Sequence, residues 1–242
     1  MIENSSSLEF KNVTFGYNKK SLVLSNISFV AKNSDTSQLG HVTAIMGNSG
    51  AGKSTILNLL LGIFTNFEGE IITNPKEPVI SFVPQTPELF EHLTPIQNAN
   101  FFENISNYKS KYNTKLFDEL VITLDLAEVL KAKSVNELSG GQKQRLMLLR
   151  ALSIKPNFLL LDEPCTGLDA EGKMQFLYKL RQLVKEYDLF VIYITHHQDE
   201  AKIIADDIIY LTKDPLTNCV NNINNLRFAK KILRKKDLDI FL

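Results

Sequence analysis

The stretch VTAIMGNSGAGKSTILNLLLGIF, residues 42 to 64, decides the fold of this chain because it reads as a strand, a loop and a helix in succession. Its first five residues are apolar and rich in β-branched side chains, which is typical of a strand buried within a sheet. The residues from Lys53 to Phe64 have helical character and are apolar enough to be buried. The stretch therefore predicts one unit of an α/β fold with a parallel sheet.

The loop of this unit, GNSGAGKST, satisfies the P-loop pattern. Glycines let the backbone curl so that its N–H groups point at phosphate oxygens, and the helix N-terminus adds positive potential. Lys53 is expected to reach the outer phosphates and the Ser54 hydroxyl to ligate Mg²⁺. The strand before the loop and the helix after it disfavour the alternative of a merely flexible glycine and serine loop. The predicted phosphate-binding residues are Gly47, Asn48, Ser49, Gly50, Ala51, Gly52, Lys53, Ser54 and Thr55.

FLLLDE, residues 158 to 163, supplies a chemical partner for this loop. It reads as an apolar strand that delivers Asp162 and Glu163 at its carboxyl end, where ligands of open α/β sheets bind. Adjacent strand residues point to opposite faces, so the two carboxylates can do different work. We expect Asp162 to hold Mg²⁺ through its water shell and Glu163 to orient and deprotonate an attacking water. An acidic turn that only caps the strand is the alternative.

The rest of the chain alternates strands with helices, apart from one helical insertion. Residues 8 to 30 read as a hairpin or two strands, residues 94 to 136 show helical stretches without a clear strand, and the asparagine-rich residues 218 to 225 read as a loop. Further strands are expected at residues 69–72, 79–83, 189–194 and 207–211, and helices at residues 142–154 and 170–186. This alternation predicts a mainly parallel sheet covered on both faces.

The bulk properties of the 242 residues narrow the class of protein. Lysine plus arginine equals aspartate plus glutamate at 27 each, which gives no electrostatic footprint for nucleic acid. Cys165 and Cys219 form no metal motif or disulfide framework, which suits a reducing compartment. The N-terminus lacks the features of a signal peptide, and no apolar run approaches the roughly 20 residues that cross a bilayer. We expect a chain that is not secreted, does not span a membrane and does not bind nucleic acid.

A second anion site is indicated by ELSGGQKQR, residues 137 to 145, in which a serine and two glycines precede a helix-like run. Its LSGGQ resembles, letter for letter, the signature of the ATP-binding cassette (ABC) ATPases, and the resemblance extends over about residues 8 to 212. It implies a P-loop NTPase fold with a mainly parallel central sheet, an N-terminal antiparallel β subdomain and an inserted helical subdomain. The implied parts of this single domain are residues 1–84 and 143–225 for the core with the β subdomain, 85–142 for the helical subdomain and 226–242 for a basic tail.

The resemblance assigns roles to single residues. Tyr17 looks like the aromatic residue on which adenine stacks, and Gln85 like the glutamine that touches metal or water beside the helical subdomain. Asp169 looks like the dimer-contacting aspartate and His196 like the γ-phosphate-sensing histidine. The implied catalytic residues are Glu163, His196, Gln85 and Lys53, with Ser54, Gln85 and Asp162 at the metal.

Three residues depart from the family pattern. His197 replaces the usual aspartate, and Cys165 and Gly167 replace a small polar residue and an alanine. A zinc site at the adjacent His196 and His197 is disfavoured, because neighbouring strand residues diverge and no other ligand clusters nearby in sequence. Cys165 and Gly167 are small enough for their loop, so hydrolysis is still expected.

In the family, two cassettes face each other head to tail, and each signature caps the nucleotide held by the other P-loop. Ser139, Gly140, Gly141 and Gln142 would therefore serve the ATP of a second copy or a homologous subunit, and a lone chain should be a poor ATPase. The implied function is ATP hydrolysis, with Mg²⁺, that powers transport through separate transmembrane permease subunits from the inner, cytoplasmic face of the membrane.

ELFEHLT and THHQDEA resemble stretches of bacterial importers of small polar solutes such as amino acids, which favours import and adds a solute-binding protein as a candidate partner. Export is the alternative within the class. An ABC protein of DNA repair would need coiled-coil arms or zinc modules, and a translation factor normally has two cassettes. The basic residues 226 to 236 read as a surface helix, with contact to anionic headgroups or the membrane subunit as the sharper hypothesis.

Overall fold

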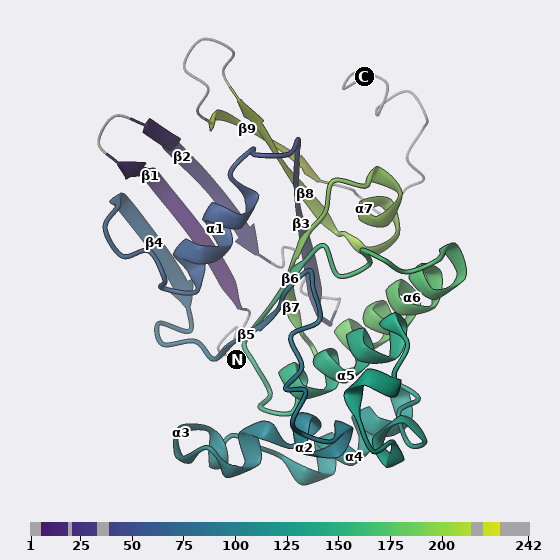
Figure 1. Ribbon diagram of the computed structural model, residues 1–242. Coiled ribbons are helices and arrows are strands. Elements are labelled where there is room, and N and C mark those ends of the chain that lie inside the picture. The colour runs from purple at the N-terminus through teal and green to yellow at the C-terminus, as the bar shows by residue number, and fades with distance from the viewer. Residues whose placement is uncertain (1–5, 19–20, 33–38, 214–219, 228–242) are drawn as a thin grey trace.

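A nine-stranded sheet runs through the part of the chain that the computed structural model describes, residues 6–18, 21–32, 39–213 and 220–227 (Figure 1). Its strand order is β4-β1-β2-β9-β8-β3-β7-β6-β5. The strands are β1 (Ser7–Asn18), β2 (Ser21–Lys32), β3 (His41–Gly47), β4 (Glu68–Asn74), β5 (Ile80–Val83), β6 (Phe158–Asp162), β7 (Phe190–Ile194), β8 (Asp207–Lys213) and β9 (Val220–Arg227). The helices are α1 (Lys53–Leu60), α2 (Pro95–Ala99), α3 (Ser106–Lys109), α4 (Thr114–Thr123), α5 (Gly140–Leu152), α6 (Ala170–Glu186) and α7 (Gln198–Ile204), with 3-10 turns η1 (Phe101–Asn104), η2 (Val129–Lys131) and η3 (Val135–Glu137).

The parallel strands β8, β3, β7, β6 and β5 form the centre of the fold, as expected. Every residue of β3 and β7 is buried, because helices cover both faces. Leu159 and Leu161 of β6 pack into a core shared with α5 and α6, whereas Leu160 between them packs with α1 and the antiparallel strands. The expected α/β class is confirmed, and the carboxyl ends of these strands lie together at one edge.

The antiparallel part of the sheet consists of β1 paired with β2 and β4, so the hairpin expected between residues 8 and 30 is confirmed. It joins the parallel part through β9, which pairs parallel to β2 at Leu24 and Val220 and antiparallel to β8. The prediction of a loop at residues 218 to 225 was therefore wrong from Val220 onward. The basic run from residue 228 and Cys219 lie outside the described residues.

Helices without strands occupy the described chain between β5 and β6, as predicted, and α2, α3 and α4 lie together at the lower end of the molecule in Figure 1. Leu120 of α4 and Leu146 of α5 share one buried cluster, which fixes this group against the rest of the fold. The first helix is shorter than its apolar run, because Gly62 adopts a left-handed φ of 69° two residues after Leu60. None of the described helices is long and apolar enough to cross a membrane.

Candidate functional site

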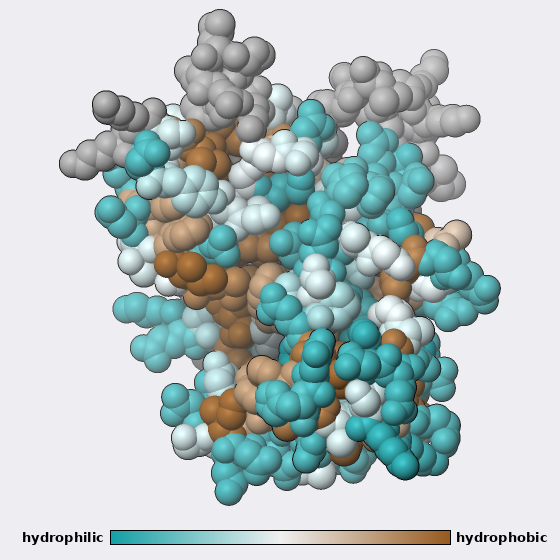
Figure 2. Space-filling view, in the orientation of Figure 1, coloured by the Kyte–Doolittle hydropathy of each residue, from teal (hydrophilic) through white to brown (hydrophobic). Residues whose placement is uncertain are grey.

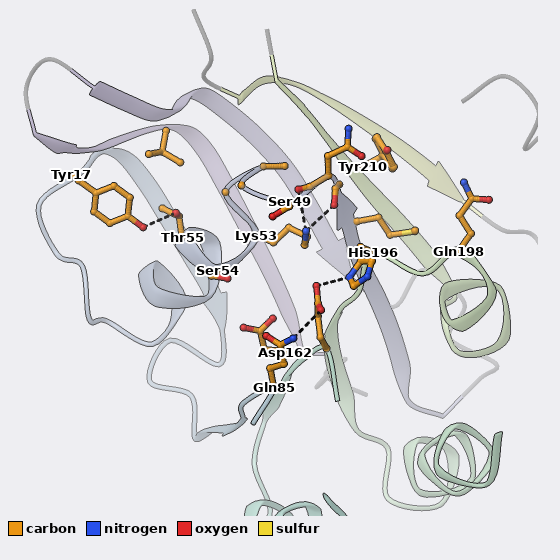
Figure 3. Close-up of a pocket in the computed structure, with 18 residues that line it drawn as sticks. Tyr17, Ser49, Lys53, Ser54, Thr55, Gln85, Asp162, His196, Gln198 and Tyr210 are labelled. Atoms are coloured by element: carbon orange, nitrogen blue, oxygen red, sulfur yellow. Dashed lines mark hydrogen bonds and ion pairs between the residues drawn. The ribbon is translucent and has the colours of Figure 1, made fainter. Parts of the chain in front are cut away.

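A cavity of about 930 Å³ opens at the carboxyl ends of the parallel strands, around the loop that precedes α1 (Figure 3). It collects predicted residues that are far apart in the sequence. The predicted residues that line it are Tyr17, Gly47, Asn48, Ser49, Gly50, Ala51, Gly52, Lys53, Ser54, Thr55, Gln85, Asp162, Glu163 and His196.

The backbone of the loop requires glycine at its two ends. Gly52 caps α1 with a φ of 78°, and a Cβ there would lie 3.0 Å from the Leu24 side chain. At Gly47 a Cβ would lie 2.8 Å from the backbone oxygen of Leu211 on β8. No side chain caps the N-terminus of α1, so its backbone N–H groups are available to an anion.

Lys53 folds back onto this loop. Its Nζ donates to the carbonyl oxygens of Gly47 at 2.7 Å and Asn48 at 3.2 Å. Burial lowers the pKa of Lys53, while the nearby Glu163 and Asp162 carboxylates oppose that shift. The ammonium thus stands between two carbonyl oxygens and an acidic cluster, as a cation available to a phosphate.

The two carboxylates line the same cavity, although we expected side chains on opposite faces. Asp162 is the last residue of β6, and Glu163 follows with a left-handed φ of 43°, so strand alternation no longer applies. Burial, and then the neighbouring Glu163, raise the pKa of Asp162 above its ordinary range. A left-handed non-glycine residue is strained, and such strain concentrates at functional sites.

Glu163 is held by two side chains from other elements, His196 and Gln85. Its Oε1 lies 2.8 Å from Nδ1 of His196, and its Oε2 accepts a 3.3 Å hydrogen bond from the Gln85 amide. Gln85 also donates to the Thr166 hydroxyl at 3.4 Å. The carboxylate that was predicted to act on water is therefore oriented by both residues that the family resemblance pointed to.

Tyr17 lies at the other end of the cavity and is 62% exposed. Its hydroxyl is 3.2 Å from that of Thr55, and its ring meets the rings of Phe15 and Phe64 edge to face. The exposure of the residue at this cavity fits the expected stacking role.

The remaining predicted residues do not reach this cavity. Ser139, Gly140, Gly141 and Asp169 line a separate cavity of about 380 Å³. Ser139 and Gln142 form a capping box on α5: the serine hydroxyl accepts from the Gln142 N–H, and the Gln142 side chain accepts from the Ser139 N–H at 2.9 Å. The structure thus divides the predicted residues into two groups at two places on the surface.

Sequence reasoning missed four residues of the first cavity, which are Val23, Met46, Gln198 and Tyr210. Met46 lies near the carboxyl end of β3, and Tyr210 of β8 is its neighbour in the register, so the pairing of β3 with β8 was the missing signal. Gln198 follows the two histidines and begins α7.

The rings of His196 and His197 were expected to diverge, and this was wrong. Their centroids are 3.9 Å apart, because β7 ends at Ile194 and both residues lie in the turn beyond it. Among the described residues, no group of three or more histidine, cysteine or acidic side chains is arranged to hold a metal ion.

Comparison with known proteins places this site in context. A model of the ABC transporter family matches residues 31–166. The sulfate/thiosulfate import ATP-binding protein CysA of Synechocystis is 37% identical over 72% of this chain and 51% of that protein. The Fe(3+) ions import ATP-binding protein FbpC of Mannheimia succiniciproducens is 32% identical over 87% of this chain and 60% of that protein.

Among solved structures, cbiO1 from Clostridium perfringens, part of the ABC transporter complex cbiONQ, is similar with a TM-score of 0.75. It is 26% identical, and the match covers 90% of this chain and 88% of that chain. The chain spans between 51% and 60% of the length of the two curated relatives.

Proposed function

We propose, from the premise that this chain belongs to the ABC transporter family, that it binds and hydrolyses Mg·ATP and thereby powers solute transport through separate membrane subunits. The observation that carries the proposal is the Glu163 carboxylate, held between His196 and Gln85 at the rim of the cavity that contains Lys53. An acid oriented in this way beside a phosphate cradle is what activation of a water molecule requires.

The residues of the loop fit a polyphosphate. Free backbone N–H groups at the start of α1 and the Lys53 ammonium are donors for phosphate oxygens. Tyr17 offers a ring face to a base at the far end of the same cavity. The left-handed φ of 78° at Gly52 and the 2.8 Å approach of a Cβ at Gly47 to the Leu211 backbone oxygen both favour glycine, so the loop keeps the conformation that exposes its backbone.

The side chains that would bind Mg²⁺ also suit this ion. The Ser54 hydroxyl, the Gln85 amide and the Asp162 carboxylate line one cavity, and hard oxygen ligands of this kind suit Mg²⁺. A bound Mg²⁺ would neutralise charge on the phosphate oxygens. Within the chain, Glu163 orients the attacking water and takes its proton, His196 fixes the carboxylate and faces the terminal phosphate, and Lys53 stabilises charge.

The second cavity supports a head-to-tail dimer. Ser139, Gly140 and Gly141 stand at the N-terminus of the 13-residue helix α5 but not in the cavity with Lys53. An anion site without a neighbouring cradle in its own chain is useful to the nucleotide of another chain. Asp169 lies beside these residues, where it would contact the partner, which is a second copy or a homologous subunit.

The helical residues 85 to 142, which we propose as a subdomain, offer a surface for a membrane subunit. A cavity of about 500 Å³ lies between β5 and this region, and its lining includes Phe90, Phe101, Phe102 and Arg150. Figure 2 shows apolar residues gathered on this face between the antiparallel strands and the lower helices. The lining also includes Phe82 and Glu88, which flank Gln85 in the sequence, so docking of the permease there would act on the segment whose glutamine holds Glu163.

Import of a small polar or charged solute, with the amino acids as one class, is the direction that we propose. Support comes from the two curated relatives, whose names describe import of sulfate or thiosulfate and of ferric ions. The chain would then work on the cytoplasmic face of the membrane beside a permease and a solute-binding protein.

The substitution Glu163→Gln tests the function. It removes the base and keeps the shape of the side chain, so hydrolysis should fall nearly to background while an ATP-bound dimer accumulates in size-exclusion chromatography. Glu128→Gln, at an exposed side chain on the helical region, is the matched control and should hydrolyse ATP normally. Normal hydrolysis by Glu163→Gln would contradict the assignment of Glu163 as the general base.

A second experiment, purification from a native membrane extract, tests the role in transport. A polytopic membrane protein that purifies with the chain supports this role, and ribosomes or DNA in its place would contradict it.

A further inference from the structure

Glu200, in the first turn of α7, is a buried carboxylate next to the candidate site. Only 2% of the residue is exposed. Its Oε2 accepts hydrogen bonds from the hydroxyls of Thr195 at 2.7 Å and Tyr193 at 3.0 Å, and its Oε1 lies 2.9 Å from Nζ of Lys173. Burying a charge is costly unless it is paired and hydrogen-bonded, so three partners around one carboxylate indicate a specified arrangement.

The Thr195 hydroxyl connects Glu200 to the backbone on the other side of His196. It donates to Glu200 and accepts a 3.0 Å hydrogen bond from the backbone N–H of His197. The His196 side chain itself is 49% exposed and contacts Glu163 through Nδ1. The position of the imidazole depends on these contacts and also on the backbone that carries it, which Glu200 holds through Thr195 and the N–H of His197.

The other partners of Glu200 join it to the loop between β6 and α6. The Tyr193 hydroxyl also lies 3.4 Å from Sγ of Cys165, two residues after Glu163. Burial raises the pKa of the Cys165 thiol to about 11, so that the sulfur stays protonated near neutral pH. Lys173 stands in α6, four residues after Asp169. One buried carboxylate thus contacts Thr195 beside His196 and the helix that follows Asp169, and it reaches the loop after Glu163 through Tyr193.

We propose that Glu200 is a positioning residue for ATP hydrolysis, which holds Thr195 and through it the backbone of His196 so that the imidazole meets the Glu163 carboxylate. The inference rests on the proposed function. Glu200 does not line the cavity and touches no substrate, so its effect should fall on turnover and not on ATP binding.

The isosteric substitution Glu200→Gln tests this role. It keeps the volume of the side chain and removes the charge that Lys173 and both hydroxyls address. We expect kcat to fall about 10- to 100-fold, because a small displacement of a catalytic group has effects of that size, with KM for ATP nearly unchanged. Asp199→Asn, which removes the exposed carboxylate one residue earlier in the same turn, is the matched control and should keep the parent kcat.

Lys173 provides a conservative rescue. Lys173→Arg keeps the positive charge beside Glu200 and should retain most of kcat, whereas Lys173→Gln should lose activity. Combining Lys173→Gln with Glu200→Gln should cost less than the two losses together, because both remove the same ion pair. Independent, additive losses would contradict the coupled network.

A readout on the imidazole separates positioning from a purely structural role. In the chain labelled with 15N-histidine, the His196 ring resonances should shift in Glu200→Gln and stay in place in Asp199→Asn. A lowered Tm with unchanged His196 resonances and unchanged kcat would overturn the proposal. If the parent chain failed to hydrolyse ATP at dimer-forming concentrations, the proposed function would fail, and the resonances would still decide whether Glu200 positions His196.

Discussion

At the scale of single residues, the carboxyl end of β6 brings two acidic side chains near the ammonium of Lys53. Asp162 and Glu163 stand together, and burial with this neighbour raises the pKa of Asp162. Residue types and spacing predicted these carboxylates and their loop. The left-handed turn at Glu163, which brings both into one cavity, could not be predicted, because it depends on packing of the loop against β7 through the Glu163 N–H and the Ile194 carbonyl.

The raised pKa of Asp162 has a consequence for stability. Its charged form is disfavoured in the folded chain, so the full cost is present above the raised pKa, shrinks as pH falls through it, and is gone below the ordinary carboxyl pKa. Asp162→Asn should therefore raise the Tm of the nucleotide-free chain by a few degrees at pH 7 to 8, and the gain should vanish near pH 4. Thermal unfolding across this range measures it, and a lower Tm than the parent at neutral pH would refute it. The same variant should lose Mg²⁺-dependent nucleotide binding.

At the scale of elements, strong periodic patterns gave reliable bounds and weak patterns did not. The strand at residues 158–162 and the helix at residues 170–186 were predicted as the structure has them, because an apolar run and an amphipathic run are each closed by turn residues. β9 was missed, because asparagine is unfavourable in strands and its pairing comes from β8, which lies earlier in the chain. Its other partner, β2, is distant in the sequence, and local sequence gives no sign of that pairing.

The start of α5 carries a prediction at this scale. Ser139→Arg removes a capping hydroxyl and places a bulky cation at the second cavity. Loss of the cap should cost roughly 1 kcal/mol of stability. Binding of a fluorescent ATP analogue to the monomer should persist, because Ser139 is outside the first cavity, while hydrolysis at dimer-forming concentrations should be abolished.

Thr94→Ala is the control for this prediction, because Thr94 and Gln97 form a second capping box on α2. It should lose similar stability and keep hydrolysis. Loss of ATP binding by the Ser139→Arg monomer would mean that the Ser139 loop contacts the nucleotide of its own chain, which contradicts the head-to-tail dimer.

At the scale of the whole molecule, α6 is attached to the sheet by a mostly buried ion pair. Arg181 makes two hydrogen bonds to the Asp206 carboxylate, at 2.7 and 2.5 Å, and Asp206 also accepts from the backbone N–H of Val42 on β3. Both side chains are mostly buried. The helix that follows Asp169 is thereby fixed to the strand that leads into the P-loop. The sequence predicted the layers of this fold, but not the pair that connects them, because the two residues belong to different elements.

Breaking this pair should destabilise the fold strongly. Arg181→Met leaves the Asp206 carboxylate without its cation in a poorly hydrated place, and we expect a loss of about 3 kcal/mol in the free energy of unfolding, measured in urea. Lys115→Met, at the exposed pair with Glu119, should change it by less than about 0.5 kcal/mol. Equal effects of the two substitutions would show that burial does not set the value of the Arg181 pair.

The place of β9 in the sheet also sets an order of events during synthesis. The strands β1 and β4 pair with each other early, but β2 is hydrogen-bonded to the parallel strands only through β9, beginning at Val220. At ordinary rates of translation, β9 leaves the ribosome roughly 7 to 30 seconds after β4. For that time the N-terminal strands have an open edge. The last described strand to be made is the one that closes it.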